Sequence, residues 1–351
     1  MIDSSGLGKR KAYILATVVY EYIATAEPVG SQSLTLKYNL GISSATVRNE
    51  MAELEAGGYL VQPHTSAGRI PSDSGYRTYV DQLMQPEALN EDERRRIRDE
   101  LGDATRELDE IIDHTTRVLG RLSNNLAFVT MPQQEAQLFK HIQLIWLSPH
   151  TGVAIVVTSL GVAAQSLFEL GAEVRPDDLT RFSNALNARL ANRLLREVTD
   201  SEIAHAAQEA GVSDDLRAAV ETAALSARSS EQPTVAAAGA QNLLDQPEFQ
   251  DLRKLRSILR IVEEQKTLYE IVADAMNADS VSVKIGHELG SEELADLSVV
   301  TVPYRFGAHA LGMLSILGPR RMPYARLLAL ASGTAETLSQ RLSDVEDLPQ
   351  A

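Results

Sequence analysis

The sequence contains no cysteine, one tryptophan and few aromatic residues of any kind (5%). The absence of cysteine excludes disulfide bonds, thiolate metal sites and cysteine nucleophiles, and it fits a reducing compartment. No stretch approaches the roughly 18 consecutive apolar residues that a transmembrane helix needs. The N-terminal residues MIDSSGLGKR also lack the apolar segment of a secretory signal. We therefore expect a cytoplasmic protein that has no membrane partner.

Motifs that carry catalysis or bind cofactors are also absent. The sequence has no GxxxxGK[ST] loop, no GxGxxG after a strand, no HExxH and no GxSxG. The seven histidines are scattered, and none lies at metal-ligand spacing from another. The sequence therefore predicts a protein that is not an enzyme and that needs no cofactor and no metal.

The length of 351 residues allows two or three domains, and the hydrophobic fraction of 44% is typical of globular proteins. The net charge of −15 argues at first against a nucleic-acid partner. The charge is uneven, however, because residues 1–84 carry seven basic and eight acidic side chains, a net charge of −1, which leaves −14 for the rest. A nearly neutral N-terminal segment ahead of an acidic body remains compatible with DNA binding through a few specific contacts.

The most informative segment is 43–58, SSATVRNEMAELEAGG. Val47, Met51 and Leu54 fall at positions i, i+4 and i+7, so they share one face of a predicted helix. Ser43 is a suitable N-cap, and the following glycine pair is a suitable stop. Small polar and cationic groups on the remaining surface indicate a DNA recognition helix, although a merely solvated helix face is the alternative. The candidate DNA contacts on this helix are Ser43, Ser44, Thr46, Arg48 and Asn49.

The flanking segments favour a winged helix-turn-helix. Helices are predicted over 9–26 and 31–39, and short strands over 59–61 and 69–70 enclose a turn-rich tip at 63–68. The tip can grip phosphates or enter a minor groove, and its alternative is an ordinary solvated turn. The candidate DNA contacts here are His64, Thr65, Ser66 and Arg69, with Arg77 on the helix that is predicted to begin at Asp73. The basic cluster Lys9–Lys11 is interpreted as a disordered lead-in to the first helix.

The rest of the chain mixes helices and strands, so the predicted fold class is α+β multidomain. The predicted helical segments are 91–125, 176–228, 247–277 and 324–342, and the predicted strands are 126–131, 139–147, 153–158, 161–170, 280–285, 298–303 and 308–317. Strands on both sides of a helical block suggest an insertion. We expect a winged-helix domain at 1–86, a helical linker at 87–125, an α+β domain at 126–172 plus 232–345 that contains Trp146, and an inserted helical subdomain at 173–231.

Several segments together resemble the family of heat-inducible transcription repressors called HrcA. The resemblance covers nearly the whole chain in order, and the stretch PHTSAGR is its most specific part. The segments are Glu27–Ser31, Ser43–Met51, Gln62–Pro71, Gly75–Arg77, Asn242–Phe249 and Gly318–Arg326.

The resemblance implies a repressor of chaperone operons that binds double-stranded DNA at an inverted-repeat operator, CIRCE. It also implies that the α+β domain is GAF-like, that the insertion forms a homodimer, and that the GroEL chaperonin maintains activity until heat diverts it to unfolded proteins. Two alternatives remain open. One is a winged-helix regulator controlled by a small ligand in the GAF-like domain, and the other is an enzyme that carries a DNA-binding appendage.

Overall fold

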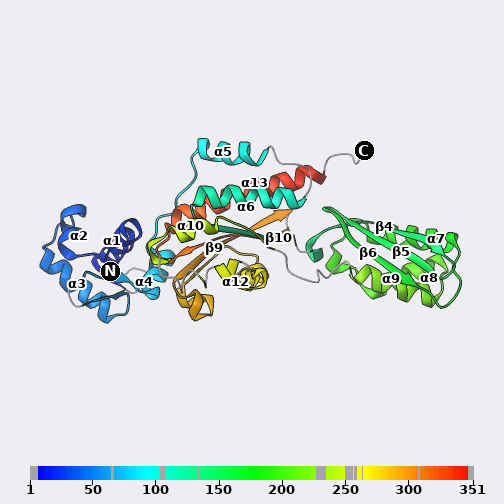
Figure 1. The fold of residues 1–351 in the computed structure, drawn as a ribbon, viewed down its shortest axis with the longest axis horizontal. Coiled ribbons are helices and arrows are strands. Elements are labelled where there is room, and N and C mark those ends of the chain that lie inside the picture. Colours follow the sequence, from blue (N-terminus) through cyan, green and yellow to red (C-terminus); the bar gives the residue numbers. More distant parts are fainter. Residues whose placement is uncertain are drawn as a thin grey trace.

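The computed structural model describes residues 7–64, 67–102, 108–132, 134–226, 235–249, 256, 259–262, 264–306 and 309–346. Three units follow one another along the longest axis of the molecule (Figure 1). The N-terminal domain lies at one end, a sheet domain lies in the middle, and an inserted unit lies at the other end. None of the helices in these ranges combines the length and the apolarity that a bilayer crossing requires.

The N-terminal domain is a small helical domain with a two-stranded hairpin. Ile14, Leu15 and Val18 are fully buried along one face of its first helix, as the helical spacing of these residues predicts. Glu21 on the same helix accepts a hydrogen bond of 2.7 Å from the hydroxyl of Tyr38. Burial and this carboxylate raise the pKa of Tyr38 to about 12. The elements are α1 (Lys9–Thr25), α2 (Ser31–Tyr38), α3 (Ser44–Ala56), β1 (Leu60–Val61), β2 (Ile70–Pro71), α4 (Asp73–Thr78) and η1 (Tyr79–Leu83). Three helices followed by a hairpin form a winged helix-turn-helix, as the sequence predicts.

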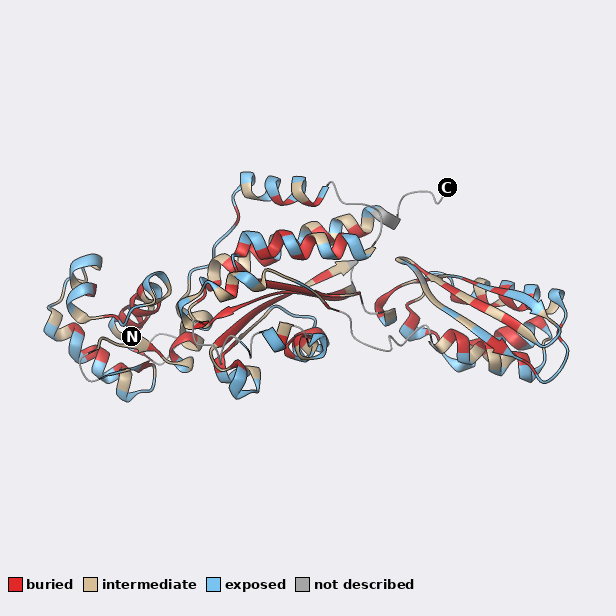
Figure 2. Cartoon of the chain, in the orientation of Figure 1, coloured by how far each residue is buried: buried red, intermediate tan, exposed pale blue. Residues whose placement is uncertain are grey.

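The sheet domain is built around a five-stranded antiparallel sheet with the strand order β7-β3-β10-β9-β8. Alternate residues of these strands enter two different hydrophobic clusters, one shared with α6 and α13 and the other with α12. Helices therefore cover both faces of the sheet, and Figure 2 shows its three central strands, β3, β9 and β10, mostly buried. Its helices are α5 (Glu91–Gly102), α6 (Leu108–Ser123), α10 (Ala240–Leu244), η4 (Pro247–Phe249), α12 (Gln265–Ala278), η5 (Gly286–Leu289), η6 (Glu292–Leu294) and α13 (Tyr324–Glu346). Its strands are β3 (Leu126–Thr130), β7 (Val235–Ala238), β8 (Ser282–Ile285), β9 (Leu297–Phe306) and β10 (His309–Pro319).

The inserted unit has its own three-stranded antiparallel sheet, in the order β4-β5-β6, and its own hydrophobic core. Helices pack against one face of this sheet, where Ile142, Ala154 and Phe168 are buried. The elements are η2 (Gln134–Ala136), β4 (Phe139–Ser148), β5 (Thr151–Thr158), β6 (Gly161–Glu169), α7 (Pro176–Leu190), η3 (Leu195–Glu197), α8 (Asp200–Ala210) and α9 (Asp214–Ser226).

Side chains of α7 occupy the outer edge of β4. The backbone N–H of Ile142 donates to Oδ1 of Asn187 at 2.7 Å, and the N–H of Leu144 donates to the Ser183 hydroxyl at 3.0 Å. Asn187 in turn donates to the carbonyl of Ile142 at 3.0 Å. These bonds satisfy edge groups that would otherwise be free to pair with another strand.

The α+β multidomain class is confirmed, but the predicted domain boundaries differ from the structure in two places. The strands within 139–170 lie in the inserted unit, which therefore begins with η2 and β4 instead of at 173. Its predicted end at 231 lies outside the described residues. The predicted linker 87–125 contains α5 and α6, whose Ile97, Leu101 and Ile111 are buried in the core that they share with α13. Strand patterns alone do not tell which sheet a strand joins, and this explains the first difference.

Trp146 also lies in the inserted unit, where its indole N–H donates to the carbonyl of Val174 at 3.0 Å. The prediction that it packs in the sheet domain is therefore wrong. The alanine-rich segment at Val235 forms the edge strand β7, which pairs with β3. The first half of the helical segment predicted over 247–277 falls largely outside the described residues, and α12 accounts for the second half.

We predict that Gly312→Ala destabilises the sheet domain. A Cβ atom there would lie 2.7 Å from both the Thr130 hydroxyl and the Tyr304 hydroxyl, which are buried and already hydrogen-bonded. We expect a loss of about 1–3 kcal/mol in the free energy of unfolding, measured by urea denaturation. Gly102→Ala is the control because it meets no atom within 4 Å and should cause no loss. Equal stability of the two variants would contradict this account of the packing.

Candidate DNA-binding surface

The helix α3 is positioned by its apolar face and by its first residue. Val47, Met51 and Leu54 are at most 1% exposed and belong to the core of the N-terminal domain. The Ser43 side chain caps the helix by accepting a hydrogen bond of 3.2 Å from the backbone N–H of Thr46. Ser43 therefore has a structural role as well as its predicted contact with DNA.

The opposite surface of α3 carries the other predicted DNA contacts. Arg48 and Asn49 are exposed, while Ser44 and Thr46 are half-buried near the start of the helix. Among the described residues, Arg48 has no ion-pair partner, so its guanidinium is available to a phosphate or to a base edge. The structure thus brings these four side chains together on one helix.

The glutamates of α3 are each paired with a cation from elsewhere in the N-terminal domain. Nε of Arg10 donates to the buried carboxylate of Glu50 at 2.6 Å, and the Lys11 ammonium lies 2.6 Å from Glu53. Arg69 completes the set through its 2.9 Å contact with the third glutamate, Glu55. This pairing lowers the repulsion that the carboxylates of α3 would exert on a DNA phosphate.

Lys9–Lys11 therefore form the first turn of α1, and the prediction that they are disordered is wrong. The carboxylate partners explain why, since Arg10 and Lys11 both bind α3. The Lys11 ammonium also lowers the pKa of the Glu53 carboxyl through its hydrogen bond.

The hairpin β1-β2 is fixed to the segment between α1 and α2 by backbone hydrogen bonds next to its tip. Val29 and Arg69 exchange two backbone hydrogen bonds of 2.9 Å, so the segment before α2 adds a third strand position to the hairpin. Gly68 permits this approach, because a Cβ atom there would lie 2.4 Å from the Val29 carbonyl oxygen. The side chain of Gln62 donates to the carbonyl of Ala67 at 2.9 Å across the tip.

Two of the predicted DNA contacts have other partners. The Arg69 side chain is only 14% exposed and binds Glu55, so it anchors the wing to α3 instead of reaching outward. Arg77 binds Glu288 of the sheet domain and Asp81, which directs its guanidinium away from the surface of α3. We therefore remove both arginines from the candidate surface. His64 is exposed at the wing tip, whereas Thr65 and Ser66 lie outside the described residues.

The roles of Arg10, Lys11 and Gln62 were not predicted from the sequence. The basic residues at the start of α1 and the glutamates of α3 are visible in the sequence, but their pairing depends on how the two helices cross. Gln62 belongs to the segment Gln62–Pro71 that carries the family resemblance, which was the only signal for it.

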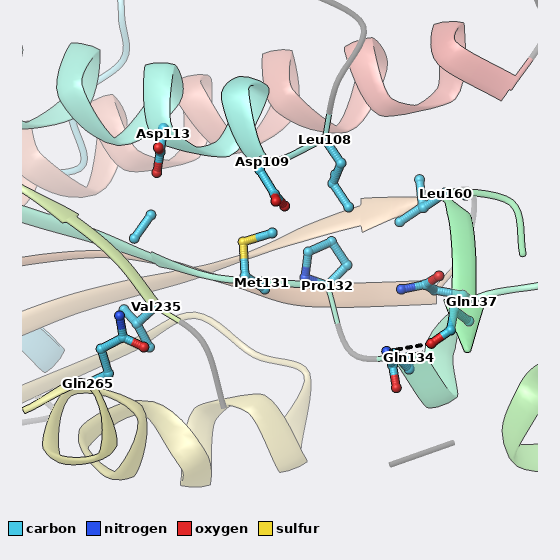
Figure 3. A pocket seen from close by; sticks show the side chains of 13 residues that line it. Leu108, Asp109, Asp113, Met131, Pro132, Gln134, Gln137, Leu160, Val235 and Gln265 are labelled. Atoms are coloured by element: carbon cyan, nitrogen blue, oxygen red, sulfur yellow. Dashed lines mark hydrogen bonds between the residues drawn. The ribbon is translucent and has the colours of Figure 1, made fainter. Parts of the chain in front are cut away.

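A separate cavity of about 460 Å³ lies where the sheet domain meets the inserted unit (Figure 3). Asp109 and Asp113 project from α6 on one side, and Gln265 lies at the start of α12. Gln134 and Gln137 line the end next to the inserted unit. These amides and carboxylates suit a small polar molecule. Within the described part of the chain, no group of three or more His, Asp or Glu side chains is arranged to hold a metal ion.

Comparisons with known proteins cover nearly the whole chain. The family model described as HrcA protein C terminal domain matches residues 109–328. A protein of Pelotomaculum thermopropionicum named heat-inducible transcription repressor HrcA is 37% identical over 340 residues, which is 97% of this chain and 98% of that protein. The protein of the same name from Geobacter sulfurreducens is 35% identical over 96% of this chain and 98% of its own length. A crystal structure of a hypothetical protein at 2.2 Å resolution is similar with a TM-score of 0.58 and 25% identity, covering 97% of this chain and 98% of that one.

We predict that Arg48→Ala weakens specific DNA binding by about 1–3 kcal/mol if Arg48 contacts a base. The reason is that the Arg48 guanidinium is exposed on α3 and has no ion-pair partner within the described ranges. Gel-shift titration with operator DNA measures the effect. Arg98→Ala is the matched control, because Arg98 is exposed and lies on α5 of the sheet domain, outside the N-terminal domain. Unchanged affinity in a folded Arg48 variant would remove this residue from the site.

Proposed function

Because the chain belongs to the HrcA family of heat-inducible transcription repressors, we propose that it represses chaperone operons by binding the CIRCE operator as a dimer. The GroEL chaperonin keeps it in the active form. The observation that carries this proposal is the surface of α3, where Arg48 and Asn49 are exposed while all three glutamates of the helix are paired with cations.

Each side chain of this surface has a distinct role in the proposal. Arg48 donates two hydrogen bonds to a guanine edge or a phosphate, and Asn49 pairs with an adenine edge. Ser44 and Thr46, near the start of α3, donate to phosphates that fix the helix in the major groove. His64, with Thr65 and Ser66, which lie outside the described residues, remains the predicted contact of the wing.

Dimerisation is assigned to the uncovered face of the inserted sheet. Ile145, Val153 and Leu167 are cross-strand neighbours on β4, β5 and β6. Ile145 is 38% exposed and Leu167 is 61% exposed, although both are apolar and both lie on regular strands. Contiguous apolar exposure of this kind on a sheet marks an association surface. A second copy of the chain supplies an identical apolar face, as a two-fold dimer requires.

The position of the inserted unit suits this assignment. It lies at the opposite end of the molecule from the N-terminal domain (Figure 1). A dimer formed there leaves both copies of α3 uncovered. Two recognition helices related by a two-fold axis then match the two halves of an inverted repeat.

The same face offers a reason for chaperonin control. In a monomer the apolar row at Ile145 and Leu167 is open to solvent, and chaperonins bind exposed apolar surface. A helper that favours the folded, paired state increases the active population by mass action. When heat-unfolded proteins compete for the chaperonin, that population falls and transcription resumes.

We further propose that the sheet domain is the GAF-like domain of the family. Its antiparallel sheet with helices on both faces supports this assignment. The cavity of about 460 Å³ at its border with the inserted unit favours a second candidate function, in which a small polar ligand controls the repressor. Ligand control would show as a metabolite that raises the melting temperature and changes operator affinity without chaperonin.

We predict that Leu167→Glu converts the dimer into a monomer, because it places a carboxylate on each side of the apolar interface. Operator affinity should then fall by roughly 10²–10⁴-fold, since bivalent binding is lost. Light scattering after gel filtration measures the oligomeric state. Gln208→Glu adds the same charge at an exposed position of α8 and should leave the dimer intact. A dimeric Leu167 variant would refute the proposed interface.

We also predict that chaperonin with ATP raises the fraction of purified repressor that binds operator DNA. The reason is that the chaperonin binds repressor monomers whose apolar face is exposed and so keeps them from unproductive association. Titration with excess operator DNA measures this DNA-binding fraction before and after incubation at a heat-shock temperature. An unfolded competitor protein should cancel the gain, and an active fraction that is insensitive to both additions would contradict chaperonin control.

A further inference from the structure

We infer that the contact between α4 and the sheet domain fixes the direction of each recognition helix and thereby sets the half-site spacing that the dimer accepts. This contact, called here the α4 joint, consists of Asp73, Arg77, His287, Glu288 and Arg320. The inference rests on the proposed dimeric binding of an inverted repeat. It makes the joint residues positioning residues that do not touch DNA.

Asp73, the first residue of α4, is held by two groups of the sheet domain. Its carboxylate accepts hydrogen bonds of 3.2 and 2.7 Å from the backbone N–H and Nδ1 of His287. It also accepts one of 2.8 Å from Arg320, whose second nitrogen lies 3.3 Å from Asp296. The start of α4 is thus fixed by a network of charge-assisted hydrogen bonds, which are stronger and more directional than neutral ones.

Arg77 makes the reciprocal contact one turn further along α4. Its Nε donates to Glu288 at 2.9 Å, and a second nitrogen binds the other oxygen of the same carboxylate. The guanidinium also donates to the backbone carbonyl of Val283 at 2.6 Å. A two-pronged contact of this kind restricts rotation as well as separation.

The packing between these ion pairs is close. Gly286 has a φ of +54°, and a Cβ atom there would lie 2.5 Å from an oxygen of Asp73, so the contact depends on glycine. Tyr76, between the two charged residues of α4, is 1% exposed, and its ring meets the ring of buried Tyr324 edge-on with centroids 6.1 Å apart. An apolar contact flanked by ion pairs leaves α4 little freedom to tilt.

A second attachment lies at the end of α1. Arg321 donates to the carbonyl of Ile23 at 3.3 Å, and it is held in place by Gln246 at 2.9 Å and by the carboxylate of Glu248. Two attachments on different helices prevent the N-terminal domain from rotating about either one. These contacts account for Gly318–Arg326 and Asn242–Phe249, two segments of the family resemblance that DNA contact does not explain.

The consequence for DNA follows from helical geometry. Along the chain, the N-terminal domain is joined to α5 by residues 84–90, which form neither helix nor strand. Half-sites on one face of B-DNA are separated by about 34–36 Å, or 10–10.5 base pairs, per helical turn. Inserting half a turn moves one half-site to the opposite face of the duplex. A dimer with stiff joints cannot follow this change, whereas a dimer with loosened joints can.

The test compares Arg320→Gln and Arg77→Gln with the unmodified protein. Arg189→Gln is the matched control, since it removes an exposed arginine from a 3.3 Å ion pair with Glu209 in the inserted unit. The probes are duplexes with the inverted repeat at its natural spacing, with the spacer lengthened base pair by base pair to half a turn, and with one half-site alone. Gel-shift titration gives affinities, and light scattering and thermal melting confirm a folded dimer.

In the unmodified protein and the control, we expect the inverted repeat at its natural spacing to bind roughly 10²–10⁴-fold more tightly than a single half-site. Half a turn of extra spacer should abolish this gain. In the two joint variants we expect the same spacer to cost about tenfold or less, with the affinity for a single half-site unchanged. A spacer profile in both variants equal to that of the unmodified protein would overturn the inference. So would a loss of single-half-site affinity, because the residues would then act on DNA contact itself. If the unmodified protein failed to prefer the inverted repeat over one half-site, the proposed dimeric function would fall first, and the inference with it.

Discussion

Electrostatic repulsion is the constraint that this molecule has to overcome, because a chain of net charge −15 belongs to a family that acts on DNA. The N-terminal domain resolves it locally. Each glutamate of α3 forms an ion pair with one cation, supplied by Arg10, Lys11 or Arg69. The helix therefore presents the exposed Arg48 without a competing carboxylate on its own surface. The acidic excess lies in the sheet domain and the inserted unit, where it disfavours adhesion to arbitrary DNA. Specific binding then depends on a small surface whose charges are already balanced.

Local pattern predicted the helices and hairpin of the N-terminal domain well. The spacing of Val47, Met51 and Leu54 identified α3 and its buried face, because helical periodicity depends on the sequence alone. The partners of Arg69 and Arg77 could not be predicted in this way. An exposed arginine and an arginine held by a distant glutamate have the same local pattern, and Glu288 lies 211 positions away from Arg77 along the chain.

The inserted unit shows a second limit of sequence patterns. Buried residues alternate with half-buried ones along β5 and with exposed ones over Ile142–Ile145 of β4, whereas every residue of β3 is buried. This difference distinguishes a sheet covered on one face from a sheet covered on both. The difference can be recognised in the sequence only once the strand partners are known. For this reason the predicted start of the inserted subdomain, residue 173, lies too late in the chain. Because helices cover only one face of the inserted sheet, its other face is open, and the proposed dimer uses this open face.

The capped edge of β4 has a consequence for the form that self-association takes. Asn187 and Ser183 occupy the hydrogen-bonding groups of Ile142 and Leu144, so this edge does not offer those groups to an incoming strand. An uncapped edge would let copies add to one another without limit, at the high temperatures where partly unfolded chains are most abundant. With that route closed at β4, the proposed association through the open face yields a finite pair, and a repressor that loses its partner can then be recovered instead of being lost to fibres.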